Sequence, residues 1–127
     1  MIGIVVVAHG GLAKEYLHAV DHVVGRQAGI VAISIEPDHD RQQKQDEICD
    51  AANAVDTGYG VVVVTDMFGS SPSNLSLRAC QPENRKIIYG ANLPMLVKLA
   101  KSRHLLVQEA VSTALAAGRK YIDSCDG

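Results

Sequence analysis

The segment IGIVVVAHGG, residues 2–11, decides the fold and also suggests where the site lies. Six of the seven residues from Ile2 to Ala8 are apolar, and most of them are β-branched. An apolar run without polar alternation is typical of a strand that is covered on both faces, as in a parallel sheet. The run ends in His9, which two glycines follow. The sequence therefore predicts an imidazole at the carboxyl end of a buried strand.

Three more runs of the same kind predict a four-stranded sheet: Ile30–Ile35, Gly60–Thr65 and Lys86–Tyr89. Helices are predicted over Gly11–Val24, His39–Val55, Pro94–Lys101 and Leu105–Gly118. Asp38 is the predicted N-cap of the second of these. A further short helix follows the third strand, with Ser71 as its N-cap and Pro72 in its first position. Strands that alternate with helices indicate βαβ units with right-handed crossovers. We therefore predict an α/β fold, a flavodoxin-like three-layer sandwich whose mainly parallel sheet has the order 2-1-3-4. The last segment, Arg119–Gly127, is predicted to be either a frayed tail or a short edge strand.

Composition narrows the class of protein. The chain has 127 residues, a net charge of −2 and three widely spaced cysteines. A length of this order suits one domain, which we predict to span residues 1–127. No basic cluster indicates a nucleic-acid or lipid partner, and the cysteines form neither a disulfide framework nor a zinc motif. The N-terminus lacks the basic region of a signal peptide, and no apolar run is long enough to span a bilayer. We predict a cytoplasmic protein.

The predicted strand order places two polar residues at one crevice. In open α/β sheets, ligands bind beyond the carboxyl ends of the strands, where the winding direction reverses. In the order 2-1-3-4 this point lies between the strand that ends at His9 and the strand that Asp66 follows. A carboxylate that accepts the N–H of one ring nitrogen leaves the other nitrogen free as a nucleophile. His9 and Asp66 are the predicted catalytic pair.

Small residues surround this pair in the sequence. Gly10 and Gly11 follow His9, and Gly69, Ser70 and Ser71 follow Asp66. Both segments lead into predicted helices, whose first N–H groups favour an anion such as phosphate. We predict that Gly10, Gly69, Ser70 and Ser71 bind phosphate, and that neither a metal nor a cofactor is needed. In purely structural interpretations, Asp66 bonds its own loop, Ser71 caps a helix and the glycines serve turns.

Three segments together resemble a known family: VVVAHGGLAKEYL, VVVVTDMFGSSPSNLS and IIYGANLPMLVKL. They are similar to the enzyme IIA domain of the mannose class of the bacterial phosphoenolpyruvate-dependent sugar phosphotransferase system. The resemblance implies that His9 accepts a phosphoryl group from the histidine-containing phosphocarrier protein and passes it to an enzyme IIB. It also implies that Asp66 and Ser71 occupy the family's aspartate and serine positions, and that the protein forms a homodimer. Sugar-transporting members usually carry a tryptophan and paired glycines in the segment after the aspartate, whereas this chain has Met67-Phe68-Gly69-Ser70. This departure concerns the assignment of a sugar substrate and not the phosphoryl chemistry.

Two other classes of function stay open at this point. A flavodoxin-like sheet also suits a nucleotide or flavin binder, although the chain contains neither a G-x-G-x-x-G fingerprint nor a P-loop. An apolar strand that runs into His-Gly also resembles small metal chelatases of the sirohydrochlorin type. Those need a second histidine across the crevice. The other histidines, His18, His22, His39 and His104, do not end a predicted strand, and His39 is predicted to lie at an exposed helix start.

Overall fold

Four parallel strands form the centre of the protein. The computed structural model describes all 127 residues. The strands are β1 (Gly3–His9), β2 (Ile30–Ile35), β3 (Val61–Thr65) and β4 (Arg85–Ile88). They pair in the order β2-β1-β3-β4, which confirms the predicted topology. His9 lies opposite Ile35 of β2, and Val7 lies opposite Thr65 of β3. β1 therefore extends two residues beyond the last pair that it forms with β3.

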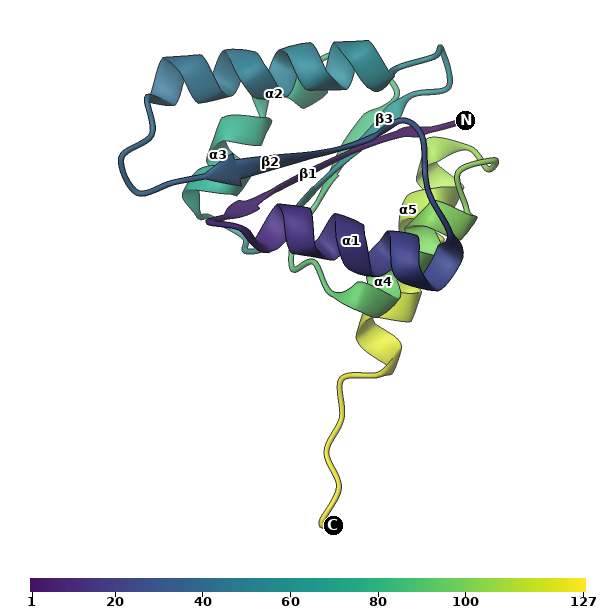
Figure 1. Cartoon of the computed structure of the whole chain (residues 1–127). Helices are drawn as coiled ribbons and strands as arrows, with labels where there is room; N and C mark the ends of the chain where they lie inside the picture. Colours follow the sequence, from purple (N-terminus) through teal and green to yellow (C-terminus); the bar gives the residue numbers. More distant parts are fainter.

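Helices cover both faces of this sheet (Figure 1). One layer contains α2 (Arg41–Val55), α3 (Ser71–Ser76) and the 3₁₀ turn η1 (Arg78–Cys80), and the other contains α1 (Leu12–Val24), α4 (Leu93–Lys101) and α5 (Val107–Lys120). The result is the predicted three-layer α/β sandwich. No helix is both long and apolar enough to cross a membrane.

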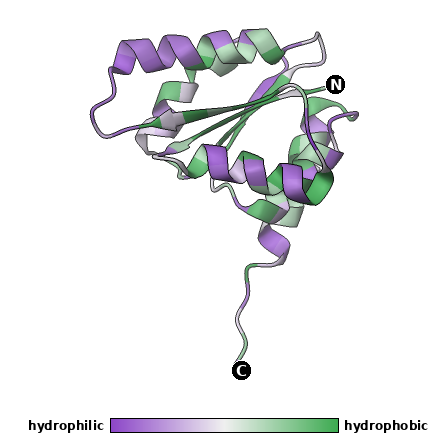
Figure 2. Ribbon diagram, in the orientation of Figure 1, coloured by the Kyte–Doolittle hydropathy of each residue, from purple (hydrophilic) through white to green (hydrophobic).

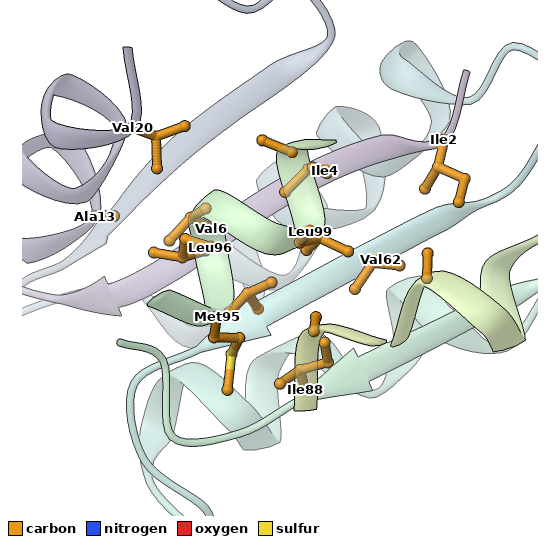
Figure 3. Packing of buried hydrophobic residues seen from close by; sticks show 14 of the residues in the cluster. Ile2, Ile4, Val6, Ala13, Val20, Val62, Ile88, Met95, Leu96 and Leu99 are labelled. Atoms are coloured by element: carbon orange, nitrogen blue, oxygen red, sulfur yellow. The ribbon is translucent and has the colours of Figure 1, made fainter. Parts of the chain in front are cut away.

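The apolar core has two halves because side chains of a strand alternate between the faces of the sheet. Ile4, Val6 and Ala8 of β1 pack under α1, α4 and α5, where Leu96 and Leu99 contact them (Figure 3). Val5 and Val7 face the opposite layer. In Figure 2 the strands are mostly hydrophobic, whereas α2 is hydrophilic along its first half. The uninterrupted apolar run of β1 thus reflects burial on both sides.

Several predicted element ends are wrong. The N-cap of α2 is Asp40, whose carboxylate accepts from the Gln43 N–H at 3.0 Å, and not Asp38. The residue before α3 is Ser70, so Ser71 is the first helical residue and is not the N-cap. α5 begins two residues later than predicted and continues to Lys120. Residues 121–127 contain no strand and extend away from the body as a tail (Figure 1), so the C-terminal edge strand does not form.

The amino ends of the strands are closed by a buried arginine. Arg103, in the connection between α4 and α5, is only 4% exposed. Its Nε donates to the Ile2 carbonyl at 2.8 Å, and its Nη2 donates to the Gly29 carbonyl at 3.3 Å. Its own carbonyl accepts the Ile2 N–H at 2.9 Å. Arg103 therefore ties the starts of β1 and β2 together and leaves the carboxyl ends as the open edge.

Candidate functional site

The structure brings His9 and Asp66 together at the carboxyl edge of the sheet. The Nδ1 atom of His9 lies 2.7 Å from Oδ2 of Asp66. The same Oδ2 accepts the backbone N–H of His9 at 3.1 Å. One carboxylate oxygen therefore fixes both the main chain and the ring of the last residue of β1.

The charge of Asp66 determines which tautomer His9 adopts. Burial raises the pKa of the Asp66 carboxyl, but the hydrogen bonds from the ring and the amide of His9 outweigh burial and hold that pKa below its ordinary value. Asp66 is therefore ionised near neutral pH and can only accept. It follows that Nδ1 of His9 carries the proton and that Nε2 carries the lone pair.

The two side chains differ in exposure: that of His9 is open to solvent, whereas that of Asp66 is mostly buried behind it. The Asp66 side chain is 9% exposed, whereas the His9 side chain is 50% exposed. The second carboxylate oxygen, Oδ1, is buried and has no hydrogen-bond partner. The bonds from His9 are thus the ones that compensate a buried negative charge, which makes the pair stronger than a neutral hydrogen bond.

A shallow groove of about 440 Å³ contains His9. Its walls are formed by residues that follow β1, β2 and β3: His9, Gly10, Ile35, Glu36, Pro37, His39 and Ser71. Sequence reasoning missed Glu36, Pro37 and His39 because it considered only the gap between β1 and β3. β2 is the other neighbour of β1, so the loop that follows β2 also reaches this edge. The strand order itself was the signal that could have revealed them.

Two of the four predicted phosphate-binding residues, Gly10 and Ser71, line the groove of His9, and the other two do not. Gly10 lines the groove at a φ of 56°, but its N–H already donates to the Ile35 carbonyl at 3.0 Å. Ser71 lines the groove, whereas Gly69 and Ser70 are not among the lining residues. The Ser70 hydroxyl lies 2.8 Å from the Met67 carbonyl, to which it donates. Ser71 is therefore the predicted residue best placed to contact a group on His9.

Tyr16 and Asn92 hold the segment after β4 in place at the carboxyl edge of the sheet. The Tyr16 hydroxyl of α1 donates to the Ala91 carbonyl at 3.0 Å, and burial, with a contribution from the Asp66 charge, raises the pKa of Tyr16. Asn92 caps α4 by accepting the Met95 N–H at 3.0 Å, and its amide donates to the Gly118 carbonyl at 2.9 Å. These contacts hold the segment after β4, and they give Asn92 a structural role.

Of the two alternative classes, metal chelation gains one feature, a second histidine (His39) in the groove of His9, but no complete metal-binding cluster. The chain contains no group of three or more His, Cys, Asp or Glu side chains that could hold a metal ion. Phe68, two residues after Asp66, forms an edge-to-face pair with Tyr89, with 4.9 Å between the ring centroids. The largest groove, about 620 Å³, lies between α4 and α5 and contains none of the predicted site residues. The candidate site at His9 is therefore distinguished by its chemistry and not by its volume.

Comparison with known proteins identifies the family of this chain. The family model for the mannose-type enzyme IIA, described as "PTS system fructose IIA component", matches residues 3–117. The chain belongs to the mannose-type enzyme IIA family. This confirms the resemblance carried by the three sequence segments, and it favours phosphoryl transfer over flavin binding and metal chelation.

Curated relatives of this enzyme IIA chain include parts of sugar phosphotransferase systems. The mannose-specific EIIAB component of Escherichia coli K12 is 29% identical over 124 residues, an alignment that covers 95% of this chain and 38% of that protein. The chain thus spans about two fifths of the length of that relative. The sorbose-specific EIIA component of Lacticaseibacillus casei is 27% identical over 123 residues, covering 95% of this chain and 88% of that protein.

Solved enzyme IIA structures share the fold. The mannose/sorbose-specific IIA subunit of Enterococcus faecalis superposes with a TM-score of 0.88 at 21% identity, covering 99% of this chain and 96% of that one. The IIA protein associated with the fucose utilization operon of Streptococcus pneumoniae gives a TM-score of 0.78 at 27% identity, covering 89% and 88%. The three-layer sandwich with this strand order is therefore the family fold.

Proposed function

We propose that the protein is a phosphohistidine carrier in which His9 is the phosphoryl acceptor. The donor is the histidine-containing phosphocarrier protein and the acceptor is an enzyme IIB, in sugar uptake or in a regulatory branch of the phosphotransferase system. The observation that carries the proposal is the 2.7 Å contact between Nδ1 of His9 and the ionised Asp66. This contact leaves Nε2 of a half-exposed side chain as the nucleophile.

The transfer step balances without a metal or an added acid. The lone pair on Nε2 of His9 forms a new P–N bond while the P–N bond to the donor imidazole breaks, and the electrons of the broken bond return to the donor nitrogen. The positive charge moves from the donor ring to the His9 ring. Asp66 stabilises that charge through the Nδ1–H bond, so its contribution is larger after transfer than before.

The other predicted roles belong to the same proposal. Ser71, and the N–H groups in the first turn of α3 that have no intrahelical acceptor, would bind phosphoryl oxygens. The working unit is the single domain of residues 1–127 in the cytoplasm, as a homodimer. Met67 and Phe68 are 59% and 78% exposed beside Asp66, so they would contact the partner protein. Their identity would influence partner choice rather than the chemistry at His9.

The proposal is tested by phosphorylating the full chain with phosphoenolpyruvate, enzyme I and the phosphocarrier, followed by mass mapping of the modified residue. We expect acid-labile, alkali-stable phosphate on His9, and none on the His9→Ala protein. His104→Ala is the matched control, because His104 is exposed in the connection between α4 and α5 and should leave labelling unchanged. Phosphate that persists on the His9→Ala protein would show that another residue is the acceptor.

A further inference from the structure

His39 lies on the wall of the groove that contains His9. It belongs to residues 36–40, which connect β2 to α2, and it is half-buried rather than exposed at a helix start. The register explains its position: His9 lies opposite Ile35, the last residue of β2, so the connection that follows begins beside the nucleophile. A second imidazole therefore shares the space into which a phosphoryl group on His9 would project.

One edge of the His39 ring is anchored. Nδ1 of His39 lies 2.8 Å from the Glu36 carbonyl oxygen, which also accepts the backbone N–H of His39 at 3.2 Å. A carbonyl oxygen can only accept, so Nδ1 of His39 carries a proton. Nε2 has no hydrogen-bond partner in the protein. The ring is held by its first nitrogen, and its second nitrogen is available to a ligand.

The groove lacks any other cation. Among its lining residues, only His9 and His39 can become positively charged, and Glu36 is an acid. A phosphoryl group on Nε2 of His9 adds about two negative charges at this place. A neutral His39 would present the Nε2 lone pair to the phosphoryl oxygens, which repels them. A protonated His39 would instead present an N–H donor with a full charge.

The charged residues around His39 are mostly acidic. Asp38 and Asp40 flank it on its own connection, and Asp66 lies behind the ring of His9. The only Lys or Arg in the segment from Glu36 to Gln43 is Arg41, the first residue of α2. Acids therefore outnumber bases around His39 before any phosphate arrives, and phosphorylation increases this excess.

We infer that His39 is a phosphoryl-binding residue of the His9 site. In the phosphorylated protein its Nδ1–H stays on the Glu36 carbonyl and its Nε2–H donates to a phosphoryl oxygen. The extra proton comes from solvent, and no bond to phosphorus forms or breaks at His39. The inference rests on the proposed function of His9 and adds a coupling between phosphorylation and the uptake of one proton.

Two substitutions separate this role from a structural one. In His39→Asn the side-chain amide replaces Nδ1 and can keep the bond to the Glu36 carbonyl, but nothing replaces Nε2. In His39→Gln the amide replaces Nε2 as a neutral donor and the bond to Glu36 is lost. A structural role predicts that Gln is the worse change, whereas phosphoryl binding predicts that Asn is. His104→Asn serves as the control at an exposed histidine elsewhere in the fold.

The measurement is the equilibrium constant for phosphoryl exchange between the phosphocarrier and the full chain, read as the phosphorylated fraction of each protein. We expect His39→Asn to lower this constant roughly tenfold, as loss of a charged hydrogen bond would, and His39→Gln to lower it less. The wild-type constant should also fall more steeply with rising pH than that of either variant, because only the wild type binds the extra proton. The His104→Asn protein should match the wild type.

A second measurement uses the wild-type protein alone, so it does not depend on how the variants fold. The ¹⁵N resonances of the His39 ring should move toward imidazolium values at pH 7.5 when His9 is phosphorylated. Unmoved resonances, or an exchange constant and pH slope in His39→Asn equal to those of wild type, would overturn the role of His39 while His9 remains the carrier. Failure of the wild type to take phosphate on His9 would instead overturn the proposed function, and this inference with it.

Discussion

The two ends of the parallel sheet are built for different purposes, and their glycines show it. At the amino ends, a Cβ on Gly60 would overlap the Asn84 carbonyl oxygen and lie 2.6 Å from Cγ2 of Val107. At the carboxyl ends, a Cβ on Gly10 or Gly69 would meet no atom within 4 Å. The first end uses glycine because there is no room, whereas the second uses it beside open space. The closed end is packed for stability, and the open end carries the candidate site.

The aspartates on either side of β3 show the same contrast. Asp56, before β3, has a lowered pKa chiefly because it accepts the Gly58 N–H, with further bonds from Arg85 and Gly60. Asp66, after β3, has a lowered pKa chiefly because of the bonds from the ring and amide of His9, with a smaller contribution from its own backbone N–H, and together these overcome its burial. The first carboxylate is surrounded by its own scaffold. The second is committed to one residue, the proposed nucleophile, and keeps an oxygen without a partner.

Replacing a glycine at each end should produce the largest difference in stability between the two ends. Gly60→Ala introduces the clash with Asn84 at a φ of 92°, so we expect it to lower the free energy of unfolding by about 3 kcal/mol or more. Gly69→Ala has a similar φ of 78° in open space and should cost about 1 kcal/mol. Urea denaturation of both variants provides the test. Equal losses would show that backbone strain, and not packing, dominates at the closed end.

Removing the arginine at the closed end should be the next largest change. Arg103→Met leaves the carbonyls of Ile2 and Gly29 without their donor, and we expect a loss of about 2 to 3 kcal/mol in the free energy of unfolding. Arg26→Met, at an exposed position, is the control. His9 of the folded Arg103→Met protein should still be phosphorylated at the wild-type rate, as judged by labelling well below its melting temperature. A slowed rate would mean that the two ends are coupled.

At the open end the expected effect is on transfer rather than on stability. Asp66→Asn removes the charge that stabilises the His9 ring, so phosphoryl transfer should slow roughly tenfold or more. The free energy of unfolding should change by about 1 kcal/mol or less, because an amide oxygen can still accept from His9. Rapid-quench labelling measures the first quantity and urea denaturation the second. Asp50→Asn, on the exposed surface of α2, should alter neither.

The smallest expected effect concerns pH. Because the folded-state pKa of Asp66 lies below its ordinary value of 3.8, its contribution to stability is complete above that value and is lost as the pH falls through the lower folded-state pKa. The difference in unfolding free energy between wild type and Asp66→Asn should therefore be constant above about pH 5 and shrink below it. Urea denaturation between pH 3 and 6 measures this difference. A gap that widens on acidification would contradict the lowered pKa.

The strands were predictable because their signal is strong and local. Ile30–Ile35 has the predicted bounds, and the other strand ends differ by at most one residue. Helix starts were less predictable because several residues compete for the same cap. Asp38 and Asp40 are both suitable, but His39 closes a turn onto the Glu36 carbonyl, so the helix begins after that turn, with Asp40 as its cap. The sequence contains both acids and does not say which one the turn uses.

The site was predictable to the extent that it follows from strand order. The placement of His9 beside Asp66 needs only the order 2-1-3-4 and the polar residues at two strand ends. The strand order also places the connection after β2 at this edge, but that His39 lines the groove depends on the path of that connection, which composition does not reveal. The hydrogen bond from the Gly10 N–H to the Ile35 carbonyl could not be predicted either, because it joins two neighbouring strands.

His9 is a residue of the sheet and not of a loop, and this affects how fast the protein can work. Its main chain is paired with β2 on one side and bonded to Asp66 on the other. The imidazole therefore has little freedom to search for a productive direction. For such a preset nucleophile, turnover would be limited by how often the two proteins collide in the right orientation, so a viscous solvent should slow it in proportion.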